Sequence, residues 1–142
     1  MIYVCRKEEF SAAHKVCNPV WSQEKNEMIY GPCANPNWHG HNFEMTVKVK
    51  GTPDPVTGYV TDMKELGKLI RTLIIEKVDH KNLNEDVDFL KGILPTCEVL
   101  VVKFWEILDE PVKQMTDGRA RLHCITLSET DKNFVEYYGE KF

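Results

Sequence analysis

A segment that begins at His39 alternates between apolar and polar side chains, and this alternation constrains the fold more than any other feature of the sequence. The odd-numbered residues from 43 to 49 are apolar, and the even-numbered residues from 44 to 50 are polar. This two-residue period predicts a strand with one buried face. His39 and His41 share the odd parity, so they extend the buried face. Because an unpartnered buried imidazole is costly, the two histidines are well placed to share a cation.

A third histidine ends an earlier strand pattern. His14 shares a face with apolar residues of a segment that we expect to form a strand over residues 2–14. If this strand pairs antiparallel with the next one, as neighbouring strands often do, its end lies beside His39 and His41. Three neutral imidazoles with one open position make a catalytic zinc site. A closed structural site would need a fourth ligand, which Cys33 could supply.

The composition indicates one ordinary globular domain over residues 1–142. Hydrophobic residues make up 42% of the chain, charged residues 28%, and the formal net charge is −4. This balance, without a basic run, argues against nucleic acid as the main partner, and no apolar stretch is long enough to span a membrane. The five cysteines form neither a disulfide framework nor a CxxC pair, and the N-terminus does not resemble a signal peptide. We therefore expect reduced thiols and a cytoplasmic protein.

The order of the expected elements predicts an α+β fold, with an antiparallel sheet covered on one face by helices. Strand patterns group at the two ends of the chain, and helical periodicity is confined to the middle. The expected elements are strands at 2–14, 41–51, 122–129 and 134–138, helices from 62 to about 79 and from 95 onward, a helical turn at 22–27 within the connection 15–38, a loop at 79–84 and a turn at 117–118.

Capping residues mark the starts of the two main helices. Asp62 is a good N-cap, and Glu65 is its expected partner in a capping box. Thr96 is a plausible cap for the second helix. Pro111 is expected to limit the extension of that helix, because proline lacks the backbone N–H that a helix interior uses.

Cys33 lies in a polar, proline-bearing loop six residues before His39. A free cysteine is most often a small buried apolar residue. A thiol near a dication and an imidazole should instead have a lowered pKa, and could act as a base. We keep the structural interpretation for the other four cysteines.

Asp79 and His80 follow the first predicted helix. The helix dipole favours a histidine at the C-terminal end, which is a purely structural explanation. The functional explanation is a proton relay, in which the carboxylate orients the imidazole. The sequence leaves both explanations open, because adjacent side chains do not pair automatically.

Glu129 shares the parity of Ile125 and Leu127 in the third predicted strand, so it extends an apolar face. At the end of the strand, its carboxylate could turn to solvent. On the floor of a pocket, it could instead hold a pair of ligand N–H groups in a bidentate manner.

Five segments together resemble the 6-pyruvoyltetrahydropterin synthase family, and the resemblance covers nearly the whole chain. They are Phe10-Ser11-Ala12-Ala13-His14, Cys33 through Phe43, Asp54-Pro55-Val56-Thr57-Gly58, Asp79-His80-Lys81-Asn82-Leu83-Asn84 and Leu127-Ser128-Glu129-Thr130. Each segment alone is a weak signal, and the five in this order are a strong one. The resemblance implies a tunnelling fold, in which a four-stranded antiparallel sheet carries two helices on one face. It also implies that trimers close their sheets into a barrel, and that two trimers stack into a homohexamer with active sites between subunits.

The resemblance also implies a zinc-dependent reaction. The zinc ligands would be His14, His39 and His41. The catalytic residues would be Cys33 as the base, completed by Asp79 and His80. The reaction would convert 7,8-dihydroneopterin triphosphate to 6-pyruvoyltetrahydropterin, with loss of triphosphate.

Two further residues would contact the pterin. The resemblance implies that Glu129 anchors the pterin ring and that Thr96 adds a contact, although Cys97 stands where family members often have a second hydroxyl. The net charge provides no general attraction for a triphosphate, so local cations must supply it. Lys15, beside His14, is one candidate.

The family divides by product, and two alternatives stay open. In the branch that makes 6-hydroxymethyl-dihydropterin a glutamate tends to replace the cysteine, so Cys33 argues against that branch. Carboxytetrahydropterin synthases usually have three residues between the cysteine and HGH, whereas five intervene here, Ala34–Trp38. Pyruvoyl formation is therefore favoured over 6-carboxy-5,6,7,8-tetrahydropterin synthase of queuosine biosynthesis, which releases acetaldehyde and triphosphate from the same substrate. The non-enzyme alternative is a zinc-stabilised binding module, with Cys33 as the fourth ligand.

Overall fold

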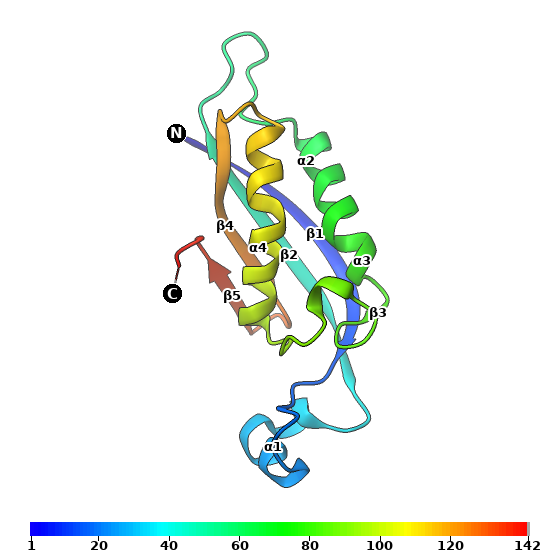
Figure 1. Cartoon of the computed structure of the whole chain (residues 1–142). Coiled ribbons are helices and arrows are strands. Elements are labelled where there is room, and N and C mark those ends of the chain that lie inside the picture. Colours follow the sequence, from blue (N-terminus) through cyan, green and yellow to red (C-terminus); the bar gives the residue numbers. More distant parts are fainter. Residues whose placement is uncertain (142) are drawn as a thin grey trace.

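A helical layer covers one face of a twisted sheet (Figure 1). The structure is a computed structural model and describes residues 1–141. The strands are β1 (Ile2–His14), β2 (His39–Gly51), β3 (Lys81–Asn82), β4 (Ala120–Ser128) and β5 (Phe134–Tyr137). The α-helices are α1 (Gln23–Tyr30), α2 (Met63–Ile70), α3 (Glu76–Val78) and α4 (Cys97–Gln114). The expected α+β class is confirmed, since the two ends of the sequence supply the long strands and the middle supplies the covering helices.

The strands β1 and β2 pair along their whole length. Their antiparallel register runs from Ile2 opposite Gly51 to His14 opposite His39. The sequence predicts that β2 starts at His41, but the strand starts two residues earlier because β1 is long enough to pair with His39. The histidines of both strands therefore reach the same end of the sheet.

The sheet has five strands in the order β3-β1-β2-β4-β5, one more than predicted. The extra strand, β3, runs parallel to β1 within the segment 79–84, for which the prediction of a loop is wrong in part. The N–H of His80 donates to the carbonyl oxygen of Ser11 at 2.6 Å. The N–H of Leu83 donates to the carbonyl oxygen of Ala13 at 2.8 Å. This polar segment supplies hydrogen-bond donors to the backbone carbonyl groups at the edge of β1. The sequence does not reveal the strand, because two residues are too few to show an alternating pattern.

The strand β4 begins two residues before its predicted start, and it ends one residue earlier than predicted. The hydroxyl group of Thr116 accepts the N–H of Ala120 at 3.2 Å, which anchors the start of the strand behind the turn at 117–118. The strand β5 ends at Tyr137, one residue before the predicted end.

The core lies between the sheet and the helices α2, α3 and α4. The four apolar residues that the alternation places on the inner face of β2 are fully buried: Phe43, Met45, Val47 and Val49. Phe10 stacks on Phe43 with ring centroids 4.8 Å apart, and Phe104 of α4 meets Phe10 edge-on at 6.1 Å. Burying each such large side chain contributes about 1.5–3 kcal/mol.

The first long helix begins at the predicted cap. The Asp62 carboxylate accepts the N–H of Lys64 at 2.8 Å and the N–H of Glu65 at 3.3 Å. The reciprocal half of the expected capping box is missing, because the Glu65 side chain has no hydrogen bond or ion pair among the described residues. The helix continues from α2 through a π-helical turn, Arg71–Ile75, into α3.

The helix α4 begins at the predicted cap and ends later than predicted. The Thr96 hydroxyl accepts the N–H of Val99 at 3.4 Å. The prediction that Pro111 limits the helix is wrong, since α4 runs through it to Gln114. The missing N–H of Pro111 removes one hydrogen bond, but the fully buried Val112 holds the last turn against the core. No helix of the described chain is long and apolar enough to cross a membrane.

The connection between β1 and β2 is more ordered than predicted. The helix α1 is longer than the predicted turn at 22–27, and a 3-10 turn, Gly31–Ala34, follows it. The side chain of the buried Asn26 accepts the N–H of Asn18 at 2.7 Å and so fastens α1 to the preceding loop. The connection extends beyond one end of the sheet (Figure 1). There the carbonyl oxygen of Cys33 accepts the N–H of Val16 at 2.8 Å.

Candidate active site and metal centre

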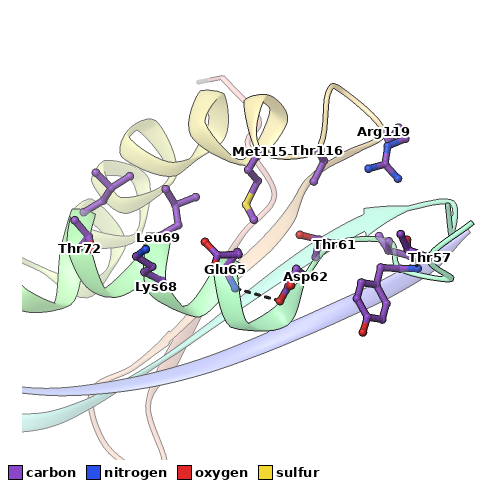
Figure 2. Close-up of a pocket in the computed structure, with 13 residues that line it drawn as sticks. Thr57, Thr61, Asp62, Glu65, Lys68, Leu69, Thr72, Met115, Thr116 and Arg119 are labelled. Atoms are coloured by element: carbon purple, nitrogen blue, oxygen red, sulfur yellow. Dashed lines mark hydrogen bonds between the residues drawn. The ribbon is translucent and has the colours of Figure 1, made fainter.

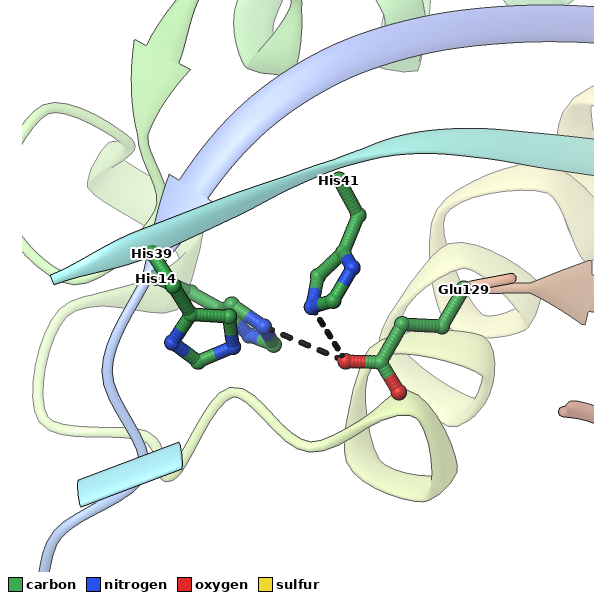
Figure 3. A group of neighbouring side chains, drawn as sticks. All are labelled: His14, His39, His41 and Glu129. Carbon is green, nitrogen blue, oxygen red and sulfur yellow. Dashed lines mark ion pairs between the residues drawn. The ribbon is translucent and has the colours of Figure 1, made fainter. Parts of the chain in front are cut away.

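Three histidines from two adjacent strands converge at one end of the sheet (Figure 3). His14 ends β1 and lies opposite His39, and His41 follows on the same face of β2. The ring centroids of His14 and His39 are 4.5 Å apart, those of His39 and His41 4.9 Å, and those of His14 and His41 5.2 Å. One donor atom from each ring and one carboxylate oxygen of Glu129 all lie within 4.8 Å of one another. The shared parity of the histidines and the antiparallel register produce this convergence.

The ring nitrogens of His14 and His39 differ in their hydrogen bonding. Nδ1 of His14 lies 2.9 Å from the carbonyl oxygen of Pro95, so this nitrogen carries the proton and donates it. The contact fixes the tautomer and leaves Nε2 of His14 with a free lone pair. Both ring nitrogens of His39 are buried without a hydrogen-bond partner among the described residues.

Burial keeps the three imidazoles neutral. Desolvation is the largest cause that lowers the pKa of His14, His39 and His41 below 6.5. Each also has a neighbouring histidine that lowers its pKa further. The negative charge of Glu129 acts in the opposite direction on all three pKa values without outweighing the burial. A neutral imidazole is the form that binds a metal ion.

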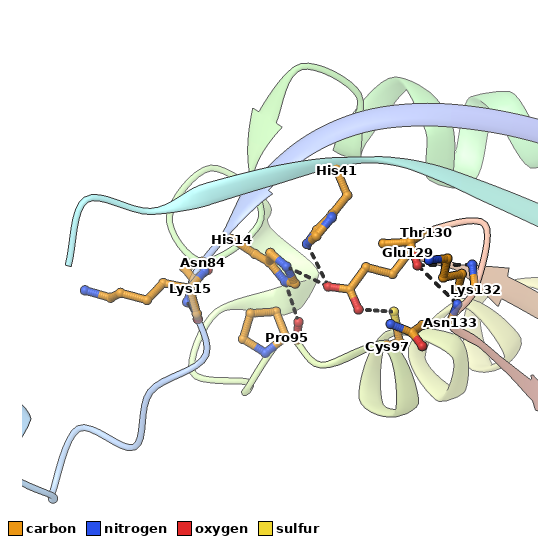
Figure 4. A network of polar contacts seen from close by, with 10 residues as sticks. All are labelled: His14, Lys15, His41, Asn84, Pro95, Cys97, Glu129, Thr130, Lys132 and Asn133. Carbon is orange, nitrogen blue, oxygen red and sulfur yellow. Dashed lines mark hydrogen bonds and ion pairs between the residues drawn. The ribbon is translucent and has the colours of Figure 1, made fainter. Parts of the chain in front are cut away.

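The Glu129 carboxylate lies beside the histidines (Figure 4). Its Oε1 atom is 2.7 Å from Nε2 of His41 and 3.3 Å from Nε2 of His14. Its Oε2 atom accepts a weak hydrogen bond from the Cys97 thiol at 3.8 Å. The side chain of Glu129 is only 22% exposed, so the alternative in which it turns to solvent is wrong.

Cys97 and Pro95 contribute contacts that the sequence does not reveal. Burial, followed by the charge of Glu129, raises the pKa of Cys97 to about 12. The thiol therefore stays protonated at neutral pH and can donate to the carboxylate. The sequence marks Cys97 only as a departure from the family pattern. The role of Pro95 rests on its backbone carbonyl, which has no signature in a sequence.

The donor set suits a small divalent metal ion. Three neutral imidazoles that face a common point are the ligands of open catalytic zinc sites. The hydrogen bond from His14 to the Pro95 carbonyl is the support that ligating histidines usually have. The fourth donor in this group is the carboxylate of Glu129 and not the thiol of Cys33.

A cavity of about 560 Å³ opens beside the cluster. It lies within the range of about 300–1,000 Å³ that is usual for small-molecule sites. Its lining brings together five of the residues discussed above: His14, Cys33, Thr96, Cys97 and Glu129. Lys132 lines it too, whereas the ammonium group of Lys15 lies 4.7 Å above the ring of Trp38. The cationic side chain in the cavity wall is therefore Lys132, and the candidate Lys15 is not part of this lining.

Cys33 is half-buried in the cavity wall. The sequence predicts a lowered pKa, but the residues of this chain have the opposite effect. Burial, followed by the charge of Glu129, raises the pKa of the Cys33 thiol. The nearby imidazoles are neutral and offer no positive charge. A thiolate here requires a cation from a metal ion or from another chain.

The side chains of Asp79 and His80 contact each other, which the sequence alone leaves undecided. Nδ1 of His80 lies 2.9 Å from Oδ2 of Asp79. The other carboxylate oxygen accepts the N–H of Ser11 at 2.8 Å, and this bond is the largest cause that lowers the pKa of Asp79. The His80 side chain is 83% exposed and lines a different pocket from Cys33. The structure therefore does not bring the pair and the thiol together within one chain.

Comparisons with known proteins agree over nearly the whole chain. The family model described as 6-pyruvoyl tetrahydropterin synthase matches residues 3–140. The "6-pyruvoyl tetrahydrobiopterin synthase" of Poecilia reticulata is 39% identical over 138 residues, which cover 97% of this chain and 90% of that protein. The human protein of the same name is 38% identical over 137 residues, which cover 96% of this chain and 91% of that protein. The structure of Caenorhabditis elegans 6-pyruvoyl tetrahydropterin synthase superposes with a TM-score of 0.86 at 35% identity, covering 98% of this chain and 96% of that one. The chain therefore belongs to the 6-pyruvoyl tetrahydropterin synthase family, and the expectation of an enzyme, a lyase of this family, is confirmed.

Proposed function

We propose that this chain is a zinc-dependent lyase that converts 7,8-dihydroneopterin triphosphate to 6-pyruvoyltetrahydropterin with loss of triphosphate. The proposal rests above all on three neutral imidazoles that converge beside a cavity lined by a thiol and a carboxylate, with both ring nitrogens of His39 unpartnered among the described residues. The names of the relatives in guppy and human support the same reaction.

His14, His39 and His41 would hold the zinc ion. Zinc bound there would supply a Lewis acid that polarises the side-chain hydroxyl groups of the substrate and acidifies the adjacent protons. Imidazole ligands favour zinc over magnesium or calcium, which prefer oxygen ligands. The Pro95 carbonyl would keep the ring of His14 in the ligating orientation.

Glu129 would orient the pterin ring. A pterin presents neighbouring N–H groups, which a carboxylate can accept in a bidentate manner. The Cys97 thiol contacts Oε2 of Glu129 and the His41 ring contacts Oε1, so both carboxylate oxygens are already positioned. Thr96, at the start of α4, would add a contact from the cavity wall.

Cys33 would act as the base that removes a proton from the substrate side chain. The residues of a single chain raise its pKa, so the thiol needs a partner that takes its proton. His80 is suited to this role, because Asp79 engages its Nδ1 and leaves its Nε2 to exchange a proton. Since this pair does not meet Cys33 within the chain, we assign the contact to His80 of a second copy.

This arrangement requires an oligomer. The strands β3 and β5 form the two edges of the sheet in the single chain. Open sheet edges pair readily with further strands. Pairing edge to edge would close three sheets into a ring, and two rings would make the homohexamer that the resemblance implies.

Two other functions are outcomes of the test rather than our proposal. A 6-carboxy-5,6,7,8-tetrahydropterin synthase would use the same substrate and the same residues. A zinc-stabilised binding module would need Cys33 as the fourth ligand. The fourth donor beside the histidines is Glu129, which favours the enzyme.

The test is product analysis by mass spectrometry. Zinc-loaded protein is incubated with 7,8-dihydroneopterin triphosphate, beside a chelated sample and two variants, Cys33→Ala and Cys5→Ala. The exposed Cys5, near the start of β1, is the matched control. We expect a pyruvoyl product that is lost on chelation and in Cys33→Ala, and kept in Cys5→Ala. A carboxy product with acetaldehyde would move the chain to the other branch. No conversion, with unfolding on chelation, would leave the binding module.

A further inference from the structure

Figure 2 shows a second cavity, of about 550 Å³. It lies at the end of the sheet opposite the histidines, because its lining follows the end of β2 that pairs with the start of β1. It is bounded by α2 and the π-helical turn that follows it, by the segment 57–62 that follows β2, and by the segment 115–119 that follows α4. Because β1 and β2 each span thirteen residues, the two ends of the sheet are about 40 Å apart. The two cavities share no lining residue.

Two buried threonines line this cavity, and they differ in their hydrogen bonding. Thr116 is 2% exposed, and its hydroxyl contacts the carbonyl oxygens of Val112 and Ala120 at 3.1 and 3.2 Å. Thr61 is 7% exposed, and its hydroxyl has no partner among the described residues. A buried hydroxyl without a hydrogen bond is an energetic cost that few positions in a folded protein carry. Figure 2 shows the Thr61 oxygen on the side that faces Glu65 and Met115.

Four apolar side chains form a large part of the remaining cavity lining. They are those of Val60, Leu69, Leu73 and Met115. Val60 is buried, and the other three are half-buried because the cavity lies beside them. A ligand that fills this space must therefore have an apolar body.

Two side chains of opposite charge stand unpaired on the rim. Glu65 and Lys68 lie three residues apart on α2, so they project from the same side of the helix. Neither side chain has a hydrogen bond or an ion pair among the described residues. The other two charged residues of the lining are occupied, since Asp62 caps α2 and Arg119 contacts Asp54 at 3.2 Å.

We propose that this cavity binds a free amino acid with an apolar side chain. The carboxylate of Glu65 would receive its ammonium group, and Lys68 would receive its carboxylate. The apolar side chain would cover Leu69, Leu73 and Met115. The hydroxyl of Thr61 would gain the hydrogen-bond partner that it lacks in the free protein. A hydrocarbon would leave Thr61 unpartnered, and a simple anion would be repelled by Glu65 and Asp62.

The test is calorimetric titration and thermal unfolding of the full zinc-loaded chain. The probes are L-leucine, L-methionine and L-phenylalanine. Glycine lacks the apolar body, L-leucinamide lacks the carboxylate, and N-acetyl-L-leucine lacks the ammonium group. We expect at least one of the three amino acids to bind once per chain and the three control compounds to bind at least about ten-fold more weakly. Dissociation constants above ~10 mM for all three amino acids would overturn the proposal.

Variants separate this cavity from the metal centre. Thr61→Val should raise the melting temperature of the unliganded protein by about 2–5 °C, because it removes an unpartnered hydroxyl. The same change should weaken binding about ten-fold, as should Glu65→Gln and Lys68→Gln, which alter exposed side chains only. Amino acids can also bind metal ions, so the titration is repeated on His39→Ala. Binding that survives in His39→Ala supports the proposal. The proposal is overturned if binding disappears in His39→Ala, or if the affinity is unchanged in all three cavity variants.

Discussion

Oε1 of Glu129 lies 2.7 Å from Nε2 of His41, and Glu129 is the fourth side chain of the group whose donor atoms could hold a metal ion. A carboxylate oxygen this close to an imidazole nitrogen needs a proton or a cation to balance its charge. Glu129 therefore has two possible uses in this site. It can bind the metal ion as a fourth ligand, or it can stand beside the metal and hold the substrate. The proposed function requires the second use.

Replacing Glu129 distinguishes these two uses. We expect Glu129→Gln to keep about one zinc ion per chain and to lower kcat/KM about 100-fold, because the pterin loses charge-assisted hydrogen bonds. The measurements are metal content by mass spectrometry and steady-state kinetics. Glu98→Gln, which alters another carboxylate in the same cavity lining, is the control and should retain most of the activity. Loss of the metal in Glu129→Gln would make Glu129 a ligand.

The three clustered histidines should each be necessary for metal binding. We expect His14→Ala, His39→Ala and His41→Ala each to weaken zinc affinity by at least about 100-fold, since each removes one of three ligands. His123→Ala is the matched control, because His123 lies on β4 between the rings of Tyr3 and Tyr138 and away from the cluster. Equilibrium competition with a chromophoric chelator measures the affinities. Unchanged zinc affinity in any of the three variants would remove that residue from the ligand set.

The convergence of the histidines follows from local patterns in the sequence. Parity places His39 and His41 on one face, and the end of the first strand pattern places His14 beside them. The position of Glu129 does not follow from such patterns. It depends on the register that sets Ser128 opposite Glu44, between strands far apart in the chain. A single sequence specifies the two faces of a strand much better than it specifies the register of distant strands.

Other differences have equally physical causes. The continuation of α4 past Pro111 depends on burial of Val112, which outweighs a local helix-breaking preference. The raised pKa of Cys33 depends first on its burial and then on the charge of Glu129, and only the tertiary structure creates either. The identity of the candidate residues was thus predictable from the sequence. The effects of distant residues on helix length and on pKa values were not.

Acid should release the metal and destabilise the protein together. Burial lowers the pKa of His14, His39 and His41 in the folded chain, whereas an unfolded chain protonates them near pH 6.5. Below about pH 6.5 the unfolded state therefore binds more protons than the folded state, and the free energy of unfolding falls as the pH falls. Thermal unfolding and zinc retention between about pH 8 and pH 5 measure both effects. A melting temperature that does not change over this range would contradict the pKa argument.

The core beneath the cluster should make a large contribution to stability. Phe43 is fully buried, and its ring lies 5.7 Å from the ring of His14 and 5.5 Å from that of His41. We expect Phe43→Ala to lower the free energy of unfolding by about 3–5 kcal/mol, because it removes a large side chain and leaves a cavity. Phe134→Ala, at a residue that is 61% exposed, should change it by less than about 0.5 kcal/mol. Urea unfolding of both variants gives the comparison, and equal effects would contradict it.

Two inactive variants should restore activity when they assemble together. Cys33 and His80 line different pockets of one chain, and the proposed function therefore takes the base and the relay from different copies. In a ring assembled at random from equal amounts of Cys33→Ala and His80→Ala chains, one site in four combines an intact Cys33 with an intact His80. We therefore expect about a quarter of the wild-type activity after the two variants are unfolded, mixed and refolded together. Each variant refolded alone is the control and should stay inactive. A mixture as inactive as its components would mean that the relay serves the thiol of its own chain, or serves no thiol at all.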